Sequence, residues 1–254
     1  MKAIWRGAIG FGLVNIPVKL YSATQQSNLD LDMVDKRNME KIHFQRVNEN
    51  TGKEVKWENI GKAFRIKDKY VLLDEEDFAS AAPAKSKIIE VNHFVNESEI
   101  DTIYYENSYY IEPDKSGYKA YGLFRDALIE SGKVGIAQFV LRTSEVLTVI
   151  KPMNKILLLS KIRFAEEIRD TGEFTLPPIK GTKPSELKMA IAIIKQYSGK
   201  FNISKFKDEY SADLLKLIKA KSKGKMKNIT TPEVSHTKTK DLMEQLKASL
   251  KKAS

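Results

Sequence analysis

Short extended segments, separated by glycine, proline and tight turns, occupy most of the chain up to about residue 170. The opening runs AIWRGAIGFG and VNIPVKLYSAT are of this kind, as is the aromatic stretch from Tyr104 to Ile111. Aromatic and β-branched residues favour strands, and several short strands at this spacing are typical of a barrel or sandwich. The sequence therefore predicts a mainly β domain with some helices over residues 1–180.

Residues 134–164 carry the clearest strand pattern. The runs VGIAQFVLRT, EVLTVIKPM and KILLLSKIRF predict a meander, with turns at Thr143-Ser144 and Pro152-Met153-Asn154. Two helices are expected within the β region, a short one from Asp74 to Ser80 and a longer one from Tyr118 to Glu130. The longer helix places three apolar side chains on one face and ends at Ser131-Gly132; they are Tyr121, Phe124 and Leu128.

After Pro177-Pro178 the pattern becomes helical, which predicts a helical arm over residues 181–220. Pro184 suits a first helical position, and Leu187, Ile191 and Ile194 form an apolar stripe that stops at Ser198-Gly199. A second helix is expected from apolar residues at helical spacing, namely Phe206, Tyr210, Leu214, Leu217 and Ile218.

Residues 221–240 predict a flexible basic linker. Lysines stand at alternate positions around its start, and their repulsion, together with Gly224, disfavours a helix there; they are Lys219, Lys221, Lys223, Lys225 and Lys227. Residues 241–254 then predict an amphipathic helix that begins at Asp241 and has an apolar face of Leu242, Met243, Leu246 and Leu250. So short a helix is unstable alone, so we expect it to fold against a partner.

The formal net charge of +10 suggests an acidic partner, most economically nucleic acid, although a merely soluble basic protein has the same composition. The excess is unevenly placed. Residues 199–254 contain 14 lysines and 6 acidic residues, which leaves 29 basic and 27 acidic residues before them. We expect a soluble protein without a membrane span, because no apolar run reaches the roughly 18 residues that a span needs.

No catalytic or metal-binding motif stands out, so we expect a protein that is not an enzyme and has no cofactor. The absence of cysteine excludes disulfides and thiolate ligands. His43, His93 and His236 lack neighbours at metal-ligand spacing. Gly7, Gly10 and Gly12 are in the wrong order for a dinucleotide loop. Glu75-Glu76 lies at a predicted helix start, where acidic residues are favourable without any catalytic role.

Residues 1–24, MKAIWRGAIGFGLVNIPVKLYSAT, closely resemble the opening of the bacterial Ku proteins, the DNA-end-binding factors of non-homologous end joining. The resemblance extends along the chain through VLLDEEDFAS, NSYYIEPDKSGYKAYGLFRDAL, EEIRD, KPSELKMA, FKDEY and DLMEQLKASL. It implies a Ku-core β-barrel whose long loops close into a ring around duplex DNA in a homodimer, followed by a helical C-terminal arm. The matching loop is about residues 28–70.

The resemblance also implies sequence-independent binding to phosphate and sugar by cations of the loop and the linker. The candidate DNA-binding residues are Lys36, Arg37, Lys41, Arg46, Lys53, Lys56, Arg65, Lys67, Lys221, Lys223, Lys225 and Lys227. Arg142, Lys161 and Arg163 are weaker candidates on the barrel. A solvated surface charge is the alternative for each of them, because acidic residues are nearly as frequent in the loop.

The implied partners are double-stranded DNA ends, a second copy of the chain and a ligase D-type multidomain DNA ligase, with no membrane. The ligase would bind the face formed by Leu242, Met243, Leu246 and Leu250. The implied location is the bacterial cytoplasm, in association with the nucleoid. Many relatives have a Cys-x-x-Cys pair where this chain has Asn48 and Thr51, so we expect no metal there. General nucleic-acid binding or compaction without end preference is the main alternative.

Overall fold

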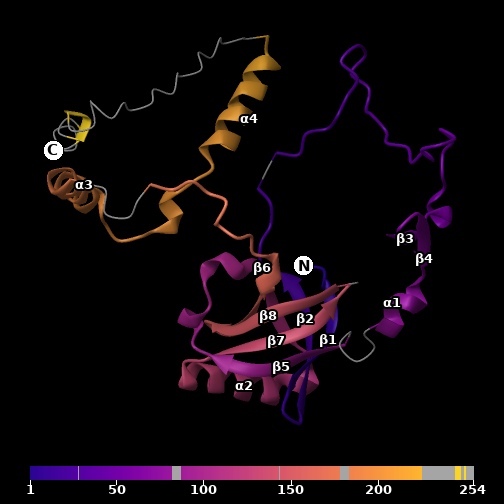
Figure 1. Cartoon of the computed structure of the whole chain (residues 1–254), viewed down its shortest axis with the longest axis horizontal. Coiled ribbons are helices and arrows are strands. Elements are labelled where there is room, and N and C mark those ends of the chain that lie inside the picture. Colours follow the sequence, from indigo (N-terminus) through magenta and orange to yellow (C-terminus); the bar gives the residue numbers. More distant parts are fainter. Residues whose placement is uncertain are drawn as a thin grey trace. The chain divides into compact units, whose positions relative to one another are not determined.

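The computed structural model describes residues 1–27, 29–81, 87–142, 144–177, 183–224, 244–246 and 249 (Figure 1). The chain forms two compact units. The first comprises residues 1–27 and 32–170, and the second comprises residues 28–31 and 171–254.

Among the described residues, seven strands of the first unit close into a barrel with the order β1-β2-β6-β9-β8-β7-β5. Their bounds are β1 Trp5–Phe11, β2 Val14–Ser22, β5 Ile88–Val95, β6 Tyr105–Pro113, β7 Val134–Leu141, β8 Ser144–Met153 and β9 Ile156–Ile162. This arrangement confirms the predicted fold class of a β-barrel with helices.

The first two strands form a hairpin with a two-residue turn. Phe11 pairs with Val14, and Gly12 adopts a positive φ of 57° that favours glycine. Along β2, buried Ile16, Val18 and Leu20 alternate with more exposed neighbours, which gives the period of two expected when one sheet face lines a core. The opening residues therefore supply part of the barrel wall.

Parallel pairing between β1 and β5 closes the barrel. Ala8, Ile9 and Gly10 lie opposite Ile88, Ile89 and Glu90, whereas the other barrel pairs are antiparallel. Ile9 and Ile89 are both fully buried at this junction. Closure joins two strands that are separated in sequence by β2 and the whole of residues 23–87.

Helix α2, Tyr118–Ser131, packs its apolar face on the barrel core (Figure 1). Phe124 lies against Phe11 and Phe94, with ring centroids 5.1 and 6.4 Å away. The buried Tyr121 hydroxyl donates to the Ile111 carbonyl at 2.8 Å and accepts from the Leu157 amide at 2.7 Å. It thus bridges β6 and β9 at the end of their ladder.

The segment between β2 and β5, called the inserted segment here, is described over residues 29–81. It contains a single 3-10 turn at Trp57–Asn59, the hairpin β3 Lys62–Ile66 and β4 Lys69–Leu73, and helix α1 Glu75–Ala81. The helix confirms the one predicted from Asp74 to Ser80. Its start is held by reciprocal hydrogen bonds between Asp74 and Asp77, and Glu75 and Glu76 lie in its first turn.

Among the described residues, five further 3-10 turns connect the main elements, at Glu97–Glu99, Thr102–Tyr104, Lys115–Gly117, Ala165–Glu167 and Ile203–Lys205. The second unit contains helices α3 Pro184–Tyr197 and α4 Glu209–Lys221. Pro184 occupies the first turn of α3 as predicted, and the Asp208 carboxylate caps α4 by accepting from the Ser211 amide at 2.9 Å.

Several predicted boundaries need correction. Pro152 and Met153 pair with Leu157 and Ile156 as the end of β8, so the turn is formed by Asn154 and Lys155, and Asn154 has a φ of 56°. Phe206 precedes α4 instead of belonging to it, and Lys219 and Lys221 lie in its last turn. Favourable interaction of these cations with the helix C-terminus opposes the repulsion that we expected to end the helix earlier.

Within the described ranges, no helix is both long enough and apolar enough to cross a membrane.

Candidate nucleic-acid interface

Residues 34–54 of the inserted segment are organised by two isolated β-bridges, Val34 with Lys41 and Val47 with Glu54. Inside the second bridge, the Asn48 side chain accepts from the amides of Asn50 and Thr51 at 3.0 and 3.1 Å. Gly52 follows with a φ of 65°. Asn48 and Thr51 thus belong to a turn closed by side-chain to backbone hydrogen bonds.

Three of the candidate cations form ion pairs with nearby carboxylates. Arg37 lies 2.7 Å from Asp35, Lys41 lies 3.0 Å from Asp32, and Arg65 lies 3.5 Å from Asp68. The Arg37 guanidinium holds the pKa of the Asp35 carboxyl below its ordinary value through their hydrogen bonds. These pairs are exposed, so their carboxylates compete with phosphate for the same cations.

Arg46 has an aromatic partner instead. Its guanidinium carbon lies 4.7 Å from the ring centroid of Trp57, which is 71% exposed. A cation over a ring face at this distance is attracted by the ring quadrupole and keeps its charge. Trp57 is the residue of this segment that sequence reasoning missed; the Val47–Glu54 bridge brings its ring near Arg46, and no local motif signals that contact.

The other four candidates of this segment, Lys36, Lys53, Lys56 and Lys67, form no ion pair with any described residue. All four are exposed. Lys67 lies in the turn between β3 and β4 with a φ of 53°. The segment therefore contains some cations that are paired with carboxylates and others that are free to bind phosphate. The sequence alone shows only that basic and acidic residues are nearly equally frequent there.

The barrel candidates differ from one another. Lys161 and Arg163 both bind the Glu106 carboxylate, at 2.7 and 2.9 Å, and Arg163 also donates to the carbonyls of Ile103 and Tyr105. Lys161 holds the pKa of Glu106 below its ordinary value through their hydrogen bond. These two cations are part of a contact between β6 and the end of β9. Arg142 lies next to β7 with a φ of 63°.

In the second unit, Lys221 is the last residue of α4, and Lys223 follows it in an exposed turn. Leu246 lies in a helical stretch with Glu244 and Gln245 and is partly exposed. The remaining candidates lie outside the described residues; they are Lys225, Lys227, Leu242, Met243 and Leu250. Within the described ranges, no group of three histidine, aspartate or glutamate side chains is arranged to hold a metal ion.

Residues 10–190 match the family model described as the Ku70/Ku80 beta-barrel domain. This match covers the barrel strands from the end of β1 to β9, together with the inserted segment and the first part of α3. A closed barrel interrupted by a long, cation-bearing segment is thus the architecture of a known class of β-barrel domain. The chain belongs to the Ku family.

Curated relatives extend the match over nearly the full chain. The chain is similar to the non-homologous end joining protein Ku of Coxiella burnetii, with 36% identity over 98% of this chain and 94% of the relative. The corresponding protein of Archaeoglobus fulgidus is 36% identical, with 98% of each chain covered. That of Pseudomonas aeruginosa is 35% identical, over 96% of this chain and 85% of the relative.

Proposed function

We propose that the protein binds the ends of double-stranded DNA without catalysis, as a ring-shaped homodimer that recruits a DNA ligase in non-homologous end joining. The observation that supports this best is the inserted segment, which combines available cations with large exposed apolar side chains. Membership of the Ku family and the names of the curated relatives support the repair role.

The β3–β4 hairpin supports the homodimer. Phe64, opposite Val71, is 66% exposed on one face, whereas Tyr70 and Leu72 are 73% and 68% exposed on the other. A two-stranded hairpin in water is marginally stable at best, and apolar side chains on both faces favour a covering partner. A second copy presents the same hairpin and forms a closed two-fold assembly, so we assign it as the partner.

Lys36, Lys53, Lys56 and Lys67 are the cations proposed to contact phosphate from this segment. Binding to phosphates needs no base-specific geometry, so it suits DNA ends of any sequence. A ring adds the preference for ends, because only a free end can be threaded through it. Further phosphate contacts come from the alternate lysines, namely Lys219, Lys221, Lys223, Lys225 and Lys227. Residues 241–254 bind the ligase through Leu242, Met243, Leu246 and Leu250.

The decisive experiment compares the affinity of the purified protein for one plasmid in two forms, covalently closed and linearised, and for a single strand of equal length. We expect clear binding to the linear duplex and much weaker binding to the closed circle. Equal affinity for the linear and circular forms would exclude threading and favour general nucleic-acid binding or compaction.

A further inference from the structure

A cavity of about 600 Å³ opens on the barrel unit, between the outer surface of β2 and β6 and the first turn of α2. Tyrosines are the most frequent residues of its lining, which also contains one carboxylate, one lysine, Met1 and apolar side chains. The polar side chains of the lining are Tyr21, Tyr110, Tyr118, Tyr121, Glu112 and Lys155. Neither the inserted segment nor the second unit contributes to it, so the cavity is separate from the proposed DNA contacts.

Strand register explains why the tyrosines gather here. Tyr21 lies opposite Tyr110, and the neighbouring pair Leu20 and Ile111 is fully buried, so the two tyrosines face outward from the barrel. The β6–β9 ladder ends where Ile111 pairs with Leu157, and Tyr121 spans the opening. Beyond this pair β6 and β9 are no longer paired, and Ile111 and Ile156 line the cavity there.

The carboxylate of Glu112 has no cation partner among the described residues. One of its oxygens accepts from the Tyr21 hydroxyl at 2.7 Å. Lys19, which lies opposite Glu112 in the β2–β6 ladder, instead binds Asp114 at 2.5 Å. Glu112 thus retains an unneutralised negative charge and an acceptor oxygen at the cavity wall.

The hydroxyls of Tyr110 and Tyr118 are also available. Neither makes a hydrogen bond with any described residue, and Tyr118 is 59% exposed. Each presents a ring face together with a hydrogen-bond donor. The cavity therefore offers flat aromatic surfaces, donors for carbonyl groups and one negative charge.

We propose that this cavity binds an extended, proline-containing segment of a partner protein with a lysine or arginine beside the prolines. A polyproline II segment has free carbonyls along its length and few amide donors, which matches tyrosine hydroxyls that donate. Aromatic-lined grooves recognise such segments through proline rings packed on aromatic faces. The lysine or arginine of the segment forms an ion pair with the Glu112 carboxylate. This charge complementarity is the reason for assigning a proline-containing segment with a basic residue as the occupant.

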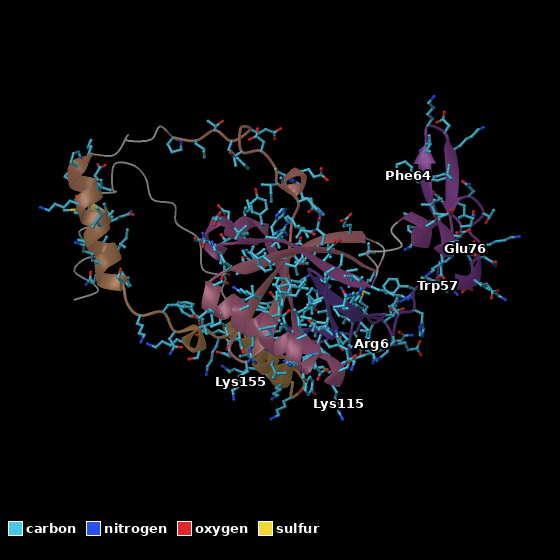
Figure 2. All side chains as sticks on the ribbon, turned by 90° about the horizontal axis from the view of Figure 1, so that it is seen from below. Arg6, Trp57, Phe64, Glu76, Lys115 and Lys155 are labelled. Carbon is cyan, nitrogen blue, oxygen red and sulfur yellow. The ribbon has the colours of Figure 1, made fainter. Side chains whose placement is uncertain are left out.

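A nucleotide fits the cavity less well. Glu112 repels phosphate, and the cations among the described lining residues are Lys155 and the α-amino group of Met1. Figure 2 labels Lys155 at the outer surface of the barrel unit. Lys155 is exposed, so it lies at the rim and can pair with an acidic residue that follows the prolines.

The test measures binding of a fluorescein-labelled peptide, Ala-Pro-Pro-Leu-Pro-Pro-Arg-Ala, by anisotropy with the full-length protein. We expect saturable binding that Tyr118→Ala weakens at least tenfold. Glu112→Gln weakens it about fivefold, in keeping with an exposed ion pair. A second peptide, with glutamine in place of arginine, binds the wild type and Glu112→Gln equally.

Glu130→Gln is the matched control, since Glu130 is an exposed carboxylate near the other end of α2, and it leaves peptide binding unchanged. Thermal unfolding verifies that all variants fold. DNA-end binding is measured in parallel and stays unchanged in the variants, so failure of this proposal is distinguishable from failure of the DNA proposal. The proposal is overturned if the arginine peptide does not bind, if it binds Glu112→Gln and the wild type equally, or if single-stranded DNA displaces it.

Discussion

At the scale of single residues, the lysines and arginines of the inserted segment are not equivalent. Arg37, Lys41 and Arg65 have carboxylate partners within reach, whereas Lys53 and Lys56 have none among the described residues. A phosphate that binds one of the paired cations must compete with that carboxylate. Available lysines should therefore contribute more to the salt dependence of DNA binding than paired cations do.

We expect the double substitution Lys53→Gln and Lys56→Gln to weaken binding to linear duplex DNA. The slope of log affinity against log salt should flatten by about 0.9 for each phosphate that the variant no longer neutralises. The measurement is a salt titration of DNA binding, with Arg37→Gln and Lys41→Gln as the matched control pair. An equal change of slope in both doubles would contradict the distinction between paired and available cations.

The hydroxyl of Tyr121 links three elements, because it forms hydrogen bonds from α2 to both β6 and β9. Tyr121→Phe leaves the Ile111 carbonyl and the Leu157 amide unsatisfied in a buried place, which should lower the free energy of unfolding by about 1–3 kcal/mol. Urea denaturation measures the loss. Tyr118→Phe, at an exposed hydroxyl, is the control and should change stability by less than about 0.5 kcal/mol.

The same residue predicts a dependence on alkaline pH. Burial raises the pKa of Tyr121 above its ordinary value of 10.0, so the folded protein retains the phenolic proton at a pH where the unfolded chain releases it. The free energy of unfolding should therefore fall as the pH rises above about 10. Tyr121→Phe should reduce this slope, and an unchanged slope would exclude Tyr121 as its origin.

At the scale of elements, the strands made of continuous runs of apolar and aromatic residues were predictable from the sequence. The meander β7 to β9 was predicted because its sequence consists of three apolar runs separated by short turns. In the structure these runs form part of the barrel wall. Its second turn was misplaced because Pro152 normally ends a strand. Here Pro152 lies one residue from the end of β8, where the missing amide donor disrupts little of the ladder.

The β3–β4 hairpin was missed because it lacks a polar face and a glycine-containing turn. Both faces contain apolar residues, and the turn places Lys67, a residue type without left-handed preference, at a positive φ. The Arg46–Trp57 contact was equally unpredictable, since it joins residues across a single β-bridge. The ion pair between Arg37 and Asp35 could have been predicted from the sequence, because the two residues are only two positions apart.

The hairpin provides the test of the homodimer. Phe64→Ser combined with Tyr70→Ser removes one large apolar side chain from each face, and we expect dissociation into monomers at micromolar concentration. Light scattering with size-exclusion chromatography measures the mass; Figure 2 marks Phe64 on this element. Leu123→Ser, at a 70% exposed position of α2, is the control and should leave the mass unchanged. A monomeric wild type would refute the proposed assembly itself.

At the scale of the whole molecule, the positive charge and the barrel are separate features. Residues 1–198 are nearly balanced in charge, so the proposed ring depends on its shape and on locally sorted cations. Residues 199–254, with 14 lysines and 6 acidic residues, supply most of the excess. Barrel closure through β1 and β5 could not be derived from the sequence, because parallel pairing across so many residues leaves no local pattern.

Because the proposed DNA contacts and the proposed ligase face lie in different segments, we expect DNA-end binding and ligase stimulation to be separable. Removal of residues 241–254 should abolish stimulation of the ligase while it leaves DNA-end binding intact, because the proposed ligase face lies within that segment. A ligation assay and an end-binding assay on the same preparations measure the two effects. Leu246→Asp should reproduce the loss of stimulation, whereas Ser249→Asp, at an exposed position, should not. Loss of end binding on truncation would contradict the assignment.

The parallel junction of β1 with β5 also has an evolutionary consequence. Because Ile9 and Ile89 seal the wall directly, the barrel core does not depend on how many residues lie between Ser22 and Ile88. Doubling a flexible connection adds only about 0.6 kcal/mol to the entropy of closing it. Insertions and deletions in that connection are therefore tolerated by the barrel, so natural selection and protein engineers can lengthen or shorten it without redesigning the core.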